Sequence, residues 1–132
     1  MRALRAVLVV IGVLCGISVL GAVLPWSALV RIAEFWGLQP PPADPLVVYS
    51  ARVGCLLGGL IGAFFLVLSS DPVRYRPMLV LGTAGLFLTG VVCLLTGWMT
   101  GLPLTGYLGD VTFCLVGAIL ICAFWPKGAQ SA

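Results

Sequence analysis

Four long runs of apolar residues follow one another along the chain, separated by short polar stretches. A membrane-spanning helix uses about 20 predominantly apolar residues, and each run has about this length. The pattern therefore predicts four spanning helices. Their expected bounds are residues 4–24, 46–68, 78–97 and 103–125.

The first run begins after Arg2 and Arg5 and so has the positive start of a secretory signal peptide. The apolar part of a signal peptide is typically about 7–15 residues long, whereas this run has the length of a span. It leads into Pro25-Trp26 without a small-x-small cleavage site. We therefore expect a retained first span.

A short amphipathic helix is expected between the first and second spans, with Ser27 as its N-cap and Gly37 as its stop. Arg31 and Glu34 lie away from its apolar face, and a tryptophan at each end suits the lipid headgroup region. The helix is therefore predicted to lie in the membrane interface. Its apolar face comprises Trp26, Leu29, Val30, Ala33 and Trp36.

Composition supports a membrane location for the whole chain. Of its 132 residues, 61% are hydrophobic and 8% charged, and the mean hydropathy is +1.20. A water-soluble domain of this size needs more polar surface than that. Because four spans use nearly all of the length, we expect one all-α integral membrane domain over residues 1–132, a four-helix bundle in the lipid bilayer.

The basic residues indicate orientation rather than nucleic-acid binding, because they are scattered and form no stripe. Cytoplasmic connections of membrane proteins are enriched in arginine and lysine. Only Arg31 lies in the opposite connections, so both termini and the turn at 71–77 are expected in the cytoplasm. The basic residues on the predicted cytoplasmic side are Arg2, Arg5, Arg74, Arg76 and Lys127.

Chemistry-bearing residues are sparse. The chain has no histidine, and its five cysteines form no CxxC pair and fall inside apolar runs. These features argue against a zinc site, a histidine-ligated haem and a dithiol centre. We therefore expect no metal, no cofactor, no catalytic residues and no enzymatic activity.

Glycines recur at four-residue intervals in the first two spans. Such a stripe lets another helix approach closely, and in lipid this packing replaces the missing hydrophobic drive between helices. We therefore expect these glycines to form helix-packing faces. They are Gly12 and Gly16 in the first span and Gly54, Gly58 and Gly62 in the second.

Two charges stand out well inside the spans, Arg52 and Asp110, each seven residues after the proline that opens its span. At 1.5 Å per residue both lie about 10 Å into their helices, and each follows a tyrosine, Tyr49 or Tyr107, by three residues. An unpaired charge at the bilayer centre costs roughly 2.5–3.5 kcal/mol on insertion scales. We therefore predict a buried polar site in which Arg52 and Asp110 pair, either as a structural clamp or as a binding site.

Four short spans, the segment Arg52-Val53-Gly54-Cys55-Leu56-Leu57-Gly58-Gly59 and the turn Asp71-Pro72-Val73-Arg74-Tyr75-Arg76-Pro77 together resemble the small DoxX-like membrane proteins and their uncharacterised bacterial relatives. The resemblance covers most of the chain and implies a bacterial inner membrane. Some members of that family are associated with quinone-linked redox enzymes as membrane subunits. No catalytic residue carries over from it.

Three function classes remain open. The first, which the sequence favours, is a non-enzymatic structural or accessory component that packs through its glycine faces with partner membrane proteins or with further copies of itself. The second is a small transporter, although small multidrug exporters depend on an acidic residue in the first span and this span has none. The third is a subunit of a redox complex that binds a quinone or lipid headgroup through the predicted polar site.

Reporter fusions at either terminus or within 71–77 should report a cytoplasmic location, because arginine and lysine favour that side by five to one across the short connections. A fusion within 26–44 serves as the external control. An external C-terminus would be incompatible with an even number of spans and a cytoplasmic N-terminus.

Overall fold

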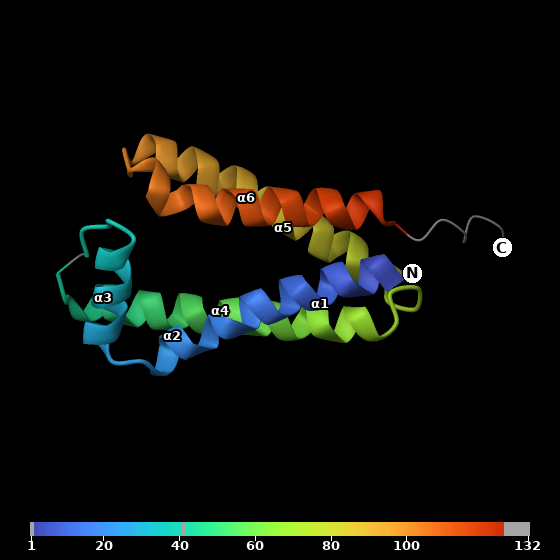
Figure 1. Cartoon of the computed structure of the whole chain (residues 1–132), viewed down its shortest axis with the longest axis horizontal. Coiled ribbons are helices and arrows are strands. Elements are labelled where there is room, and N and C mark those ends of the chain that lie inside the picture. The colour runs from blue at the N-terminus through green and yellow to red at the C-terminus, as the bar shows by residue number, and fades with distance from the viewer. Residues whose placement is uncertain (1, 41, 126–132) are drawn as a thin grey trace.

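The computed structural model describes residues 2–40 and 42–125, and the regular elements in this part of the chain are all helices (Figure 1). Four stretches are long and apolar enough to cross a membrane, which confirms the all-α fold with four candidate spans. The helices are α1 (Arg2–Ile17), α2 (Val19–Val23), α3 (Trp26–Phe35), α4 (Pro45–Ser70), α5 (Arg76–Met99) and α6 (Leu104–Ala123).

The first span is interrupted at Ser18, between α1 and α2. The Ser18 hydroxyl lies within hydrogen-bonding distance of two carbonyl oxygens, that of Cys15 at 2.6 Å and that of Cys55 in α4 at 3.0 Å. Its single proton serves both acceptors. The hydroxyl therefore satisfies the backbone at the break and also links the first span to the second.

Small residues bring α1 and α4 together. A Cβ atom added to Gly62 would lie 2.5 Å from the backbone nitrogen of Gly16 and 2.6 Å from the carbonyl oxygen of Gly12. One added to Gly58 would lie 2.5 Å from the Ser18 hydroxyl oxygen. The two backbones thus approach more closely than any larger residue would allow. Gly54 has open space at the Cβ position and lies outside this contact.

The other two spans, α5 and α6, form a second antiparallel pair joined by a short turn at Gly101, where φ is +65°. Glycines again allow the contact. The Tyr107 ring covers Gly97, where an added Cβ would lie 2.5 Å from the ring, and the Leu115 side chain covers Gly90. Each pair is therefore packed along most of its own length.

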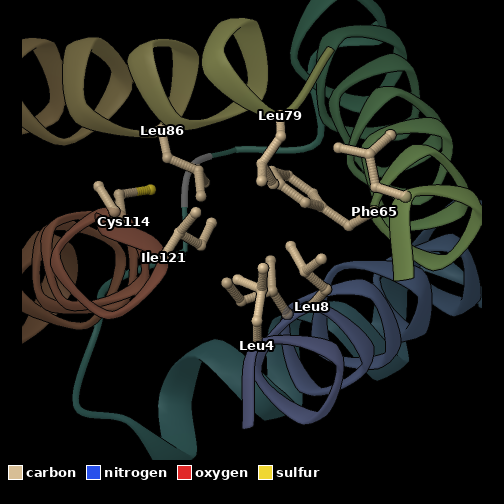
Figure 2. Close-up of a cluster of buried hydrophobic side chains, with 10 residues drawn as sticks. Leu4, Leu8, Phe65, Leu79, Leu86, Cys114 and Ile121 are labelled. Carbon is tan, nitrogen blue, oxygen red and sulfur yellow. The ribbon is translucent and has the colours of Figure 1, made fainter. Parts of the chain in front are cut away.

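The two pairs meet in only one half of the molecule. The buried cluster that joins all four spans uses the first half of α1, the end of α4, the first half of α5 and the second half of α6 (Figure 2). Toward the other end, α1 and α2 diverge from α5 (Figure 1). The shared core comprises Leu4, Leu8, Ile11, Phe65, Leu68, Leu79, Leu86, Cys114, Ala118 and Ile121.

The short helix α3 lies at the end where the pairs diverge (Figure 1). It begins at Trp26 after Pro25, so Ser27 lies inside the helix and the predicted serine cap is wrong. Gly37 has a φ of +72° and ends the helix as predicted. Just beyond it, the Leu38 side chain lies 3.0 Å from a Cβ added to Gly106, so this connection reaches the start of α6.

The glycine contact predicts a sharp difference between two substitutions on α4. Gly58→Leu should lower the free energy of unfolding by about 1–3 kcal/mol, the usual cost of overpacking, because a side chain would displace the hydrogen-bonded Ser18. Gly54→Leu, with open space, should change it by less than about 0.5 kcal/mol. Thermal unfolding of both variants in mild detergent measures this. Equal losses would show that the α1–α4 contact does not depend on close backbone approach.

Candidate functional site

The structure places the four predicted polar residues in different surroundings. Tyr107 is buried, with 8% of its surface exposed, whereas Tyr49 is 67% exposed. Arg52 and Asp110 are both exposed on their helices. Within the described residues neither of them forms an ion pair or a hydrogen bond. The four residues therefore do not make one buried cluster in this chain alone.

The absence of an Arg52–Asp110 pair follows from how the spans are arranged. Helix α4 packs on α1 and α2, and α6 packs on α5, so α4 and α6 share little contact. Arg52 lies nine residues before Ile61, which faces α5 and α6, and nine residues are two and a half turns. The arginine therefore points to the opposite side of α4. Equal depth in the two spans was not sufficient for pairing.

Asp110, in contrast to Arg52, lies on the side of its helix that faces the other helix pair. It precedes Phe113 and Cys114 by three and four residues, so it lies one turn above them on the same face of α6. Both residues line a cavity, and Cys114 belongs to the shared core. Because the pairs have diverged at this level, the Asp110 carboxylate is exposed rather than covered. Asp110 does not line the cavity itself but lies one turn from Phe113 and Cys114, toward the end where the pairs diverge.

That space contains a cavity of about 240 Å³ to which all four spans contribute. It lies where the shared core ends, on the diverging side. Thr89 contributes the only hydroxyl among its lining residues, and none of the described lining residues is charged. Two glycines of α5, Gly82 and Gly85, line it, and Gly85 has open space at the Cβ position. The sequence predictions missed this cavity, because Gly85 cannot be told from a packing glycine by its sequence position.

Tyr107 acts within the α5–α6 pair and not as part of a polar site. Its ring covers Gly97 and keeps the end of α5 in contact with the start of α6. The tyrosine is therefore a packing residue of the second pair, and its position explains why Gly97 has no side chain.

The described residues contain no group of three or more potential metal ligands. All five cysteines are free thiols. Away from their ends, the described spans thus carry Arg52, which points outward, and Asp110, which lies beside an apolar cavity. They contain no group of residues able to hold a metal.

Comparison with known proteins adds no relative: no family model, curated protein or solved structure matches this chain. The resemblance to DoxX-like proteins therefore stays a prediction. Function has to be inferred from the arrangement of the helices and of Arg52 and Asp110.

Because Arg52 and Asp110 do not contact each other, a double-mutant cycle should show no coupling energy between them. Residues that share no contact usually have additive effects, within about 0.3–0.5 kcal/mol. We therefore expect the stability changes of Arg52→Ala and Asp110→Ala to add in the double variant, measured by thermal unfolding in mild detergent. Recovery of stability in the double variant would mean that the two charges pair in the membrane after all.

Proposed function

We propose that this chain is a non-enzymatic accessory component of a membrane protein assembly, and that it binds its partner through the outward face of α4. The partner is either another membrane protein or a second copy of the chain. It supplies an acidic group to Arg52 within the outer half of the bilayer.

One observation carries the proposal: Arg52 is exposed on a spanning helix and has no ion pair or hydrogen bond within the described chain. Charged residues in spans are expensive and usually pair with another group. Within the described residues Arg52 has no such group, because it points away from α5 and α6 and forms no ion pair with Glu34 or Asp44. Tyr49, exposed one turn earlier, adds a hydroxyl on a neighbouring part of that face.

The glycine faces support this choice of surface. The sequence alone suggested that a partner would pack on the glycines, but Gly12, Gly58 and Gly62 are already used between α1 and α4. A partner therefore needs another surface. The outward face of α4 combines exposed apolar residues with the unpaired arginine, which provides both contact area and specificity. It comprises Tyr49, Arg52, Leu56 and Leu60.

We propose the membrane setting that the charge pattern favours: a bacterial inner membrane, with both termini in the cytoplasm and α3 in the outer interface. In α3 the residues Trp26, Leu29, Val30 and Ala33 are half-buried, whereas the exposed side carries Arg31 and Glu34 together with the apolar Ile32 and Phe35 and the following Trp36. This division suits a helix lying along a membrane surface. In this orientation the shared core faces the cytoplasmic half and the open end faces outward.

A headgroup-binding subunit built on all four predicted polar residues receives less support. Such a site needs convergent polar groups, and here Arg52 and Asp110 point to different sides of the molecule. The same argument weakens a transporter whose path would use both charges.

The proposal is tested by affinity purification from membranes in mild detergent, comparing Arg52→Gln with Arg31→Gln. Arg31 is exposed on α3 outside the candidate spans and serves as the matched control. Arg52→Gln should lower the amount of stoichiometric partner, or of dimer, at least about tenfold, equivalent to about 1.4 kcal/mol. Arg31→Gln should leave it unchanged.

A charge exchange sharpens the test once the partner is identified. Replacing the facing acidic residue of the partner should reproduce the loss, and exchanging the two charges should restore binding. Recovery of the same partner with Arg52→Gln as with the wild type would contradict the proposal.

A further inference from the structure

The cavity between the two helix pairs is not needed for the contact through α4, and its construction indicates a ligand. Its walls come from all four spans, including Cys15 of α1, Ile61 and Phe64 of α4, Gly85 of α5, and Phe113 and Cys114 of α6. Figure 2 shows the neighbouring core residues, with the Cys114 sulfur pointing from α6 toward the middle of the cluster. The cavity is therefore a partly open space between the two helix pairs and not a groove on one helix, and Ile61, Gly85 and Thr89 are exposed at its edge.

The apolar lining of this cavity favours a hydrocarbon as its ligand. Apolar cavities do not hold water, because water needs two to four polar partners. An empty space would deprive the surrounding side chains of dispersion contacts. The volume of about 240 Å³ is below the roughly 300–1,000 Å³ of sites that enclose a whole small molecule. It suits part of an alkyl chain, with the rest of the ligand outside.

The carboxylate of Asp110, one turn from the cavity, favours a positive charge on the part of the ligand that stays outside. Asp110 lies one turn of α6 above Phe113 and Cys114, on the face that lines the cavity. Its carboxylate has no hydrogen bond or ion pair within the described residues, and Arg52 is on the far side of α4. A carboxylate in a low-dielectric region attracts a cation strongly and disfavours an anion.

We propose that the cavity binds the alkyl chain of an amphiphile whose ammonium headgroup is held by Asp110. The chain fills the space beside Gly85, where an added Cβ atom would meet nothing within 4 Å. The headgroup lies on the diverging side of the bundle, where the Asp110 carboxylate is exposed. Such an ammonium amphiphile is either a bilayer lipid or a soluble amphiphilic amine.

The test measures binding of radiolabelled decyltrimethylammonium to the purified full chain in maltoside micelles by scintillation proximity. Binding should saturate. Excess unlabelled decyltrimethylammonium should displace the label, whereas decyl sulfate, with the same chain and a negative headgroup, should not. Absence of saturable binding, or equal displacement by decyl sulfate, would overturn the proposal.

Three variants separate the two parts of the site. Gly85→Leu fills the cavity without a clash and should weaken binding at least about tenfold, whereas Gly54→Leu, also in open space but outside the cavity, should bind as the wild type does. Asp110→Asn should weaken binding of the cation to a similar degree and remove the discrimination against decyl sulfate. Wild-type binding by Gly85→Leu or by Asp110→Asn would refute the site.

Competition identifies the source of the ammonium. Displacement by phosphatidylethanolamine added to the micelles, but not by phosphatidylglycerol, supports the site with a bilayer lipid as its ligand. Displacement by decyltrimethylammonium but by neither lipid supports it with a soluble amphiphilic amine. Because neither Gly85 nor Asp110 belongs to the outward face of α4, these outcomes are independent of the partner test on Arg52.

Discussion

Close backbone approach between α1 and α4 is the constraint on which the rest of the structure depends. In lipid there is no hydrophobic drive to bring two apolar helices together, so packing and interhelical hydrogen bonds must do so. Gly62 lies against Gly12 and Gly16, and the Ser18 hydroxyl bonds the carbonyl oxygen of Cys55 beside Gly58. This contact fixes the rotation of α4, and with it the direction in which Arg52 points.

The rotation of α4 also explains the unequal halves of the bundle. It presents Phe65 and Leu68 to α5 and α6, where they join the shared core with Leu4 and Leu8 of α1. Nearer the start of α4, the break at Ser18 and the contact of α2 with α4 carry the first span away from α5. A cavity remains where the pairs part. The proposed partner face and the proposed ligand site are therefore two consequences of one helix contact.

The sequence predicted the four spans closely, because length and apolarity decide them, and it predicted the helix end at Gly37, because the position needs a positive φ. It did not predict how Arg52 and Asp110 lie. Depth along a helix follows from residue number, but rotation depends on which neighbours the helix packs against. The cavity was missed for a similar reason, since Gly85 differs from a packing glycine such as Gly62 only in what surrounds it.

The spans of the two helix pairs share a core at one end of the bundle and diverge at the other. Pulsed electron resonance in bilayers tests this arrangement with spin labels on a variant whose native cysteines are replaced. One label pair is at Ala6 and Leu81. The other is at Leu20 and Leu95, 14 residues further along α1–α2 and α5, which run in the same direction, so the labels of each pair lie at matched levels. All four positions are exposed. We expect a clearly longer distance between the spin labels at Leu20 and Leu95 than between those at Ala6 and Leu81. Equal distances, or a shorter one at Leu20–Leu95, would contradict it.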